Sequence, residues 1–122
     1  MRSIKLLFLA LLFSTLAYSK VLTPNNFYKT IRSHKAVLVE FWAPWCPGCK
    51  MLKPNFHRAK QIAGKKVLFA TYNIDLKGDI LRRYNIEMIP TMVLFVDGKE
   101  VSRSNSILRA NEIADWVLGY VP

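Results

Sequence analysis

Two cysteines separated by two residues offer the clearest chemistry in this sequence. Cys46 and Cys49 enclose Pro47 and Gly48, and they are the only cysteines among 122 residues. Thiols at this spacing can close a small disulfide without moving the backbone, and they can exchange electrons with the thiols of other proteins. The spacing therefore predicts a redox-active pair.

Two other interpretations of the cysteine pair stay open, although redox chemistry is preferred to both. A structural disulfide is common in exported proteins, but a ring this small contributes only about 2 kcal/mol by loop entropy. A zinc site would need a second pair of ligands, and the only histidines, His34 and His57, do not stand at a zinc-ligand spacing. We expect no metal and no bound cofactor, because the electrons reside on the two sulfurs.

The places of the two cysteines along the chain predict different roles for them. An apolar strand is expected from Ala36 to Trp42, followed by a long helix from Cys46 to about Ala63. The first turn of a helix stabilises a thiolate through unpaired amide donors and the helix dipole. We therefore expect Cys46 to be the nucleophile. Cys49, deeper in the helix and less exposed, is expected to be the resolving thiol.

Glu40 is the most informative charged residue, because it stands within the apolar strand. If its side chain points inward, burial raises its affinity for protons, and it can carry a proton to or from Cys49. If strand alternation turns Glu40 to solvent, it is an ordinary surface residue. Lys50 and Lys53 on the following helix either assist thiolate formation or only keep the surface soluble. The residues alone leave both questions open.

The remaining elements predict one α/β domain. A strand, helix and strand in succession imply parallel pairing. The expected elements are a helix capped by Thr23 with Pro24 at its start, a strand over Val67 to Ile74, a short helix over Gly78 to Tyr84 capped by Asp79, a hairpin of Thr91 to Val96 and Glu100 to Ser104 around Asp97–Gly98, and a final helix over Asn111 to Leu118.

Residues 1–19 have the pattern of a cleaved secretory signal peptide, which would leave a domain over residues 20–122. A basic start precedes an apolar run from Leu6 to Leu16, and small residues stand at positions 17 and 19. The run is shorter than the roughly 20 residues that cross a membrane, so no stable insertion is expected after cleavage. The C-terminus has no retention signal. The endoplasmic reticulum lumen, a bacterial periplasm and secretion all remain possible locations.

The charge of the chain does not indicate a nucleic-acid partner. Removal of Arg2 and Lys5 with the signal lowers the formal net charge from +10 to +8. The basic residues are scattered rather than gathered into a run, which predicts a solvated basic surface.

Several motifs together resemble the thioredoxin-fold family over residues 21–121. They are the segment from Glu40 to Lys50, Pro54, Ile89–Pro90–Thr91 and Asp97–Gly98. The resemblance implies a central mixed sheet flanked by helices, with Cys46 attacking, Cys49 resolving and Pro90 in the cis form beside them. It also implies that Ile89 offers backbone hydrogen bonds to an extended substrate, on a surface completed by Trp45, Pro47 and Gly48.

Within that family, the opening residues, the acid Glu40 and the export signal are similar to the catalytic domains of protein disulfide isomerases. The pair Pro47–Gly48 reverses the order of thioredoxins and lacks the histidine of the isomerases. Thr71 stands where thioredoxins place a lysine near the buried acid. Ser106 replaces a glycine before the last helix and is expected to narrow the substrate groove.

These observations predict an exported thiol:disulfide oxidoreductase that forms, reduces or isomerises disulfides. Its partners would be cysteine-containing protein substrates and a redox protein that resets the Cys46–Cys49 disulfide. The alternative is a redox-inactive thioredoxin-fold module that binds unfolded chains or a partner subunit.

Overall fold

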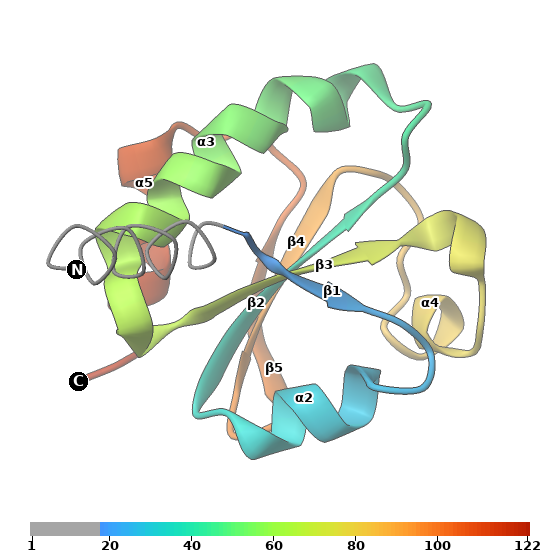
Figure 1. The fold of residues 1–122 in the computed structure, drawn as a ribbon, viewed down its shortest axis with the longest axis horizontal. Coiled ribbons are helices and arrows are strands. Elements are labelled where there is room, and N and C mark those ends of the chain that lie inside the picture. The colour runs from blue at the N-terminus through green and yellow to red at the C-terminus, as the bar shows by residue number, and fades with distance from the viewer. Residues whose placement is uncertain (1–17) are drawn as a thin grey trace, which may run out of the picture.

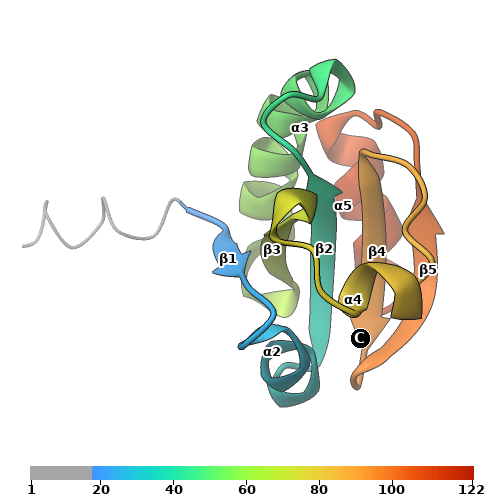
Figure 2. The ribbon, with the colours of Figure 1, turned by 90° about the vertical axis from the view of Figure 1, so that its right-hand side faces the viewer.

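A mixed five-stranded sheet forms the centre of the molecule in a computed structural model that describes residues 18–122. Most of the predicted signal peptide, residues 1–17, therefore lies outside the described residues. The strands follow the order β1-β3-β2-β4-β5, which Figure 2 shows from the side. They are β1 (Lys20–Leu22), β2 (Ala36–Trp42), β3 (Leu68–Asn73), β4 (Thr91–Val96) and β5 (Lys99–Ser104).

The central strand β2 carries the site. It pairs in parallel with β3 and antiparallel with β4, so that Glu40 lies opposite Thr71 on one side and Met92 on the other. All of its side chains are buried except Trp42, which is half-buried. This pattern confirms that β2 is covered on both faces, as its unbroken apolar sequence predicts.

Helices cover both faces of the sheet. Figure 1 shows α3 and α5 on one side and α2 and α4 on the other. One apolar core accordingly joins Leu38 and Leu94 to Phe56 of α3 and Ile113 of α5, and a second core surrounds Phe27 of α2. The helices are α2 (Phe27–Ser33), α3 (Pro47–Ala63), α4 (Ile80–Arg83) and α5 (Ala110–Leu118), with 3₁₀ turns η2 (Gly64–Lys66) and η3 (Ile74–Leu76).

The hairpin between β4 and β5 agrees with its sequence signal. Asp97 and Gly98 both have positive φ values, 51° and 78°, as the favoured two-residue hairpin turn requires. The parallel pairing of β2 with β3 is also confirmed.

The two predicted helix caps have different outcomes, and the one at Thr23 is wrong. The first helix begins at Phe27 rather than after Thr23, because the Asn26 side chain accepts a hydrogen bond from the Thr23 amide at 2.7 Å and holds a turn there. Asp79 is the N-cap residue of α4, as predicted, but its side chain makes no capping hydrogen bond. Its carboxylate instead accepts one from the Tyr28 hydroxyl at 3.3 Å.

Strand β1 was not expected from the sequence. It has three residues and pairs only with β3, so it carries too little pattern of its own to be recognised. Within residues 18–122, none of the helices has both the length and the apolar character needed to cross a bilayer.

Candidate functional site

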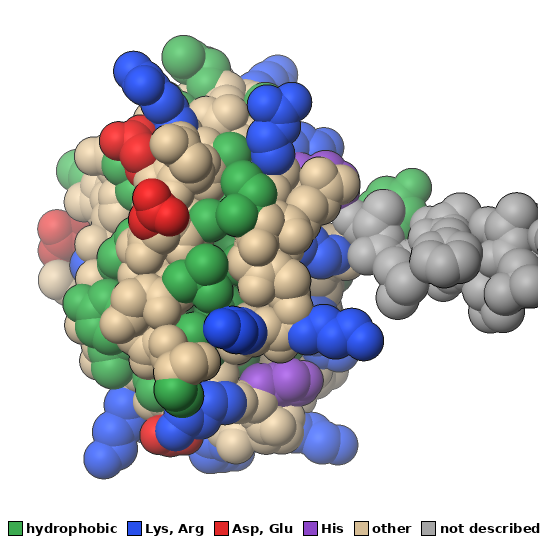
Figure 3. All heavy atoms as spheres, turned by 90° about the vertical axis from the view of Figure 1, so that its left-hand side faces the viewer, with side chains coloured by type: hydrophobic (Ala, Val, Ile, Leu, Met, Phe, Trp, Pro, Cys, Tyr) green, Lys and Arg blue, Asp and Glu red, His purple; other side chains and the backbone are tan. Residues whose placement is uncertain are grey.

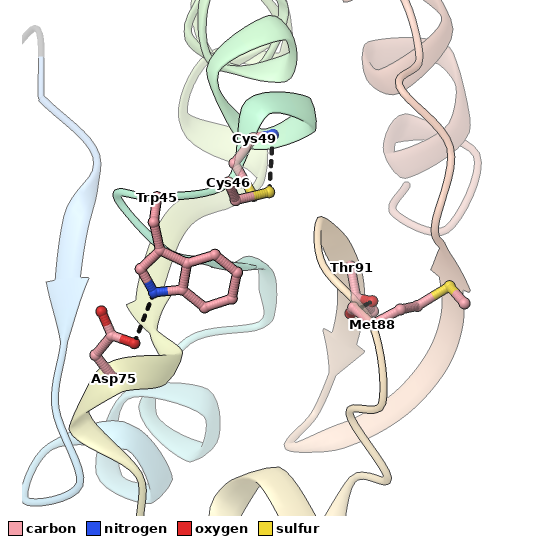
Figure 4. Close-up of a disulfide and its surroundings, with 6 residues drawn as sticks. All are labelled: Trp45, Cys46, Cys49, Asp75, Met88 and Thr91. Carbon is pink, nitrogen blue, oxygen red and sulfur yellow. Dashed lines mark hydrogen bonds between the residues drawn. A yellow bond between two sulfur atoms is a disulfide. The ribbon is translucent and has the colours of Figure 1, made fainter.

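The two cysteines lie at the start of α3, just after the loop that follows β2. Cys46 is the N-cap of α3, with extended backbone angles, and Pro47 occupies the first helical position, where its missing N–H costs nothing. Cys46 and Cys49 form a disulfide with their Cα atoms 5.3 Å apart. The Cys49 amide donates a hydrogen bond to the Cys46 Sγ at 3.2 Å, drawn as a dashed line in Figure 4. Cys46 therefore replaces the usual oxygen cap of a helix by sulfur.

The two cysteines are buried to nearly the same degree. Cys46 is 5% exposed and Cys49 is 4% exposed, so Cys49 is the less exposed residue by a very small margin only. Both pack with Ala43, and Trp42, Ile74 and Ile89 lie against this small cluster. Any difference in their chemistry must therefore come from the charges and dipoles around them.

Glu40 is buried, which decides between its two interpretations. Its residue is only 5% exposed. Desolvation raises the pKa of the Glu40 carboxyl from 4.5 to about 7, and the positive charge of Lys53 partly opposes that rise. A carboxyl with this pKa exchanges its proton near neutral pH.

A groove of about 760 Å³ opens beside Glu40. Glu40 and Cys49 both line it, from β2 and α3 respectively. Its walls are otherwise mostly apolar, and the remaining lining residues are Tyr18, Ser19, Val21, Trp42, Lys53, Pro54, Phe56, His57 and Thr71. The groove gives the buried acid a route to solvent on the side of Cys49.

Pro90 lies directly against the segment from Cys46 to Cys49, which forms the active-site turn. The Ile89–Pro90 peptide bond is cis, as the family resemblance implies. A Cβ atom placed on Gly48 would stand 3.2 Å from Pro90 Cδ. Neither backbone polar group of Ile89 takes part in a turn, loop or side-chain hydrogen bond within residues 18–122. The structure therefore brings Gly48, Ile89 and Pro90 together beside the disulfide.

Trp45 is fixed at the surface next to Cys46. It is 62% exposed, yet its indole N–H donates a hydrogen bond to Asp75 Oδ1 at 3.1 Å (Figure 4). Asp75 comes from η3, thirty residues away in sequence, and nothing in the sequence pointed to it. The contact gives an exposed aromatic side chain a defined position beside the disulfide.

Two exposed apolar residues in loops next to the site were also missed. Met88, 57% exposed, belongs to the loop before β4, where its carbonyl accepts a hydrogen bond from the Thr91 hydroxyl at 2.5 Å. Ile107 is 42% exposed, and its Cδ1 lies 3.6 Å from the position of a Cβ on Gly48. Ile107, rather than the neighbouring Ser106, is thus the side chain of this loop that approaches the active-site turn.

Metal-ligating groups do not gather elsewhere in the described residues, whereas a separate pocket is lined by Lys35, Lys60, Lys65 and Lys66 together with His34. On the face seen in Figure 3, Lys and Arg side chains lie at the rim and across the lower part of the face, among hydrophobic and polar surface. Within residues 18–122, no three His, Cys, Asp or Glu side chains lie close enough together to hold a metal ion.

Comparison with known proteins adds a family to this geometry. The family model described as Thioredoxin matches residues 18–118. A thioredoxin of Rickettsia felis is 35% identical over 78% of this chain and 91% of its own length. A thioredoxin of Chlorobaculum thiosulfatiphilum is 40% identical over 75% of this chain and 86% of its own.

A longer relative and a solved structure complete the comparison. A protein disulfide-isomerase of Drosophila melanogaster is 35% identical over 80% of this chain, which spans 20% of that protein. The structure of a mutant thioredoxin from Halobacterium salinarum matches 87% of this chain and 93% of its own, with a TM-score of 0.77 and 21% identity. That likeness establishes the arrangement of sheet and helices.

Proposed function

The chain belongs to the thioredoxin family, and from that premise we propose that it is an exported oxidoreductase that exchanges its Cys46–Cys49 disulfide with cysteines of protein substrates. Thiol-disulfide oxidoreduction is the activity of the family. The observation that carries the proposal is the disulfide closed across the first turn of α3, with a backbone amide directed at the Cys46 sulfur. In the reduced protein the same amide would stabilise the Cys46 thiolate.

The exchange proceeds in two steps when a substrate disulfide is reduced. The Cys46 thiolate attacks one substrate sulfur, and the substrate S–S bond breaks. One substrate sulfur stays joined to Cys46 in a mixed disulfide, while the other leaves as a thiolate and takes up a proton from water. Cys49 then gives its proton to the Glu40 carboxylate, and its thiolate attacks the Cys46 sulfur. The second substrate thiolate leaves and takes up a proton. The substrate gains two electrons and two protons, and the protein is left with the Cys46–Cys49 disulfide.

Glu40 is suited to the second step by its position and its pKa. It shares the groove with Cys49, and a pKa of about 7 lets it accept and release a proton without a large free-energy cost near neutral pH. The same steps run in reverse when the protein forms a disulfide in its substrate.

The surface around the disulfide supports an extended polypeptide as substrate. The backbone N–H and C=O groups of Ile89 lie beside Pro90 and make no turn or loop hydrogen bond within the described residues. An extended substrate segment can be bound through main-chain hydrogen bonds to such groups. Trp45 and Ile107 provide exposed apolar surface beside Pro47 and Gly48 at the start of α3, and Met88 adds an exposed apolar side chain in the loop before β4. We therefore propose that substrate cysteines with apolar neighbours are preferred.

Export and a resetting partner complete the proposal. The basic and apolar pattern of residues 1–19 supports cleavage after Ser19 and residence in the endoplasmic reticulum lumen, a periplasm or the extracellular medium. Members of this family act on cysteine-containing substrates with a partner that restores their redox state, and we propose such a partner here. No bound cofactor is required.

Insulin reduction in the presence of dithiothreitol tests the activity. The wild-type protein should accelerate the precipitation of insulin chains, Cys46→Ser should be inactive while keeping its fold, and Cys49→Ser should accumulate a mixed disulfide with the substrate. Persistent catalysis by Cys46→Ser would exclude the redox mechanism. An inactive wild type that still binds unfolded chains would favour the binding-module alternative.

Two further measurements test the direction and the location. Equilibration with glutathione measures the reduction potential of the Cys46–Cys49 pair. It should be about −270 mV for a reductase, or between about −180 and −120 mV for an isomerase or oxidase. Expression of the full chain in a host with a secretory pathway should yield exported protein that begins at Lys20. Retention of Met1 on protein inside the cell would contradict the proposed export.

A further inference from the structure

We propose that Lys53 is a positioning residue for the exchange, because its ammonium charge holds Glu40 in the ionised form that must accept the Cys49 proton. The kinetic part of this inference rests on the proposed function. Its electrostatic part concerns only Lys53 and Glu40 and can be tested separately.

The geometry places the three groups in one groove. Lys53 follows Cys49 by four residues on α3, and residues at this spacing lie on the same face of a helix, one turn apart. Both line the groove, and Glu40 enters the same groove from β2. The lysine, the resolving cysteine and the acid therefore meet from two elements that face each other.

Glu40 has no other compensation for its charge within the described residues. It is 95% buried, and among residues 18–122 its carboxyl takes part in neither a hydrogen bond nor an ion pair. An ionised carboxylate in such surroundings is costly unless a positive charge lies near it. Lys53 is exposed and makes no direct ion pair with Glu40, so it acts through space from solvent.

The other groups around Glu40 supply no fixed positive charge. Besides Lys53, α3 directs Cys49 and His57 into the groove. From the neighbouring strands, Thr71 of β3 and Met92 of β4 lie opposite Glu40. Tyr18 and Ser19 form the outer wall in the full chain and would be absent after the proposed cleavage. Lys53 is the one lysine or arginine that lines the groove within residues 18–122.

The absence of an ion pair between Lys53 and Glu40 sets the size of the effect at the low end for a neighbouring charge. An opposite charge within about 4–6 Å lowers the pKa of a carboxyl by roughly 1–3, and a solvated ammonium that makes no direct contact lies at the low end, about 1. With a pKa of about 7, half of Glu40 is ionised at pH 7. Without Lys53 the ionised share should fall to about one tenth, which slows the Cys49 step about fivefold at pH 7. Above about pH 9 the difference should disappear, because Glu40 is then ionised in both proteins.

Lys53→Met tests the charge while keeping most of the apolar stem, and Lys53→Arg restores the charge. Lys29→Met is the matched control, since Lys29 is an exposed residue of α2 on the other face of the sheet. Carboxyl NMR of the oxidised proteins should show the pKa of Glu40 raised by about 1 in Lys53→Met and unchanged in the other two variants. Decay of the mixed disulfide at Cys46, followed at pH 7 and pH 9, should be about fivefold slower in Lys53→Met at pH 7 only.

Each readout can overturn a separate part of the inference. An unchanged Glu40 titration in Lys53→Met would show that Lys53 does not control the acid. A shifted titration with unchanged decay of the mixed disulfide would show that Glu40 does not serve Cys49. Failure of the wild type to reduce insulin would contradict the proposed function. The NMR titration would still test, independently, whether Lys53 controls the pKa of Glu40.

Discussion

Replacement of Glu40 by Gln should make the protein more stable at high pH than the wild type. The pKa of Glu40 is raised from 4.5 to about 7 in the folded state, so between these values the folded protein holds a proton that the unfolded chain has released. The stabilising contribution of the neutral acid is therefore fully present below about pH 4.5. It is lost as the pH rises through about 7.

The magnitude follows from the two pKa values. Each pKa unit corresponds to about 1.4 kcal/mol, so the wild type should lose about 3 kcal/mol of unfolding free energy from this residue between pH 4 and pH 8. About half of the loss should have occurred by roughly pH 6. Because Glu40 is only 5% exposed, solvent screening removes little of this contribution. Glutamine has almost the same shape but no titrating group, so the loss should be absent from the variant.

Guanidinium unfolding of the oxidised proteins at pH 4, 6 and 8 measures the effect. The quantity to compare is the free energy of unfolding of Glu40→Gln minus that of the wild type, because all other titrating groups cancel in this difference. It should increase by about 3 kcal/mol between pH 4 and pH 8. A difference that stays constant within about 0.5 kcal/mol would refute the conclusion that Glu40 is buried in a site that favours its neutral form.

Two further predictions concern the substrate surface and the core. Met88→Ala and Ile107→Ala should each raise the KM for an apolar peptide substrate about fivefold, roughly 1 kcal/mol of lost contact, with kcat unchanged. Val101→Ala, an exposed apolar residue of β5, should leave both constants unchanged, and an equal effect there would contradict the assigned surface. Phe27→Ala should lower the free energy of unfolding by about 3–5 kcal/mol in a denaturant titration, because Phe27 is fully buried. Its ring contacts five other aromatic rings, those of Tyr28, Phe41, Tyr72, Tyr84 and Phe95, and a loss below about 1 kcal/mol would contradict this packing.

The parts of the site that local pattern determines could be predicted from the sequence. Cys46 precedes a proline at the start of an amphipathic segment, and this order indicates a helix N-terminus with the thiol at its cap. The unbroken apolar run of β2 indicates burial on both faces, so the sheet position of Glu40 also follows from sequence. The inward direction of the Glu40 side chain did not follow, because a strand buried on both faces has no solvent side to orient it.

Residues placed by tertiary contacts could not be predicted in this way. Asp75 reaches Trp45 across thirty residues, and Ile107 approaches Gly48 only because the loop before α5 passes the active-site turn. The cap predicted at Thr23 failed for a local reason, since Asn26 competes for the Thr23 amide and delays the helix. Local sequence motifs thus identified the reacting sulfur atoms. The side chains that surround these atoms could not be predicted, because their positions depend on contacts between elements far apart in the sequence.

The equal burial of Cys46 and Cys49 constrains how one disulfide can contain two different thiols. Cys46 receives the Cys49 amide at a helix N-terminus, which favours the charged thiolate. Cys49 faces the groove that contains Glu40. The buried carboxyl of Glu40 has a pKa of about 7, so it exchanges a proton near neutral pH instead of remaining permanently charged. The two influences come from different elements, the first turn of α3 and the centre of β2. Glu40→Gln should therefore slow the release of substrate by Cys49 and leave the initial attack by Cys46 unchanged.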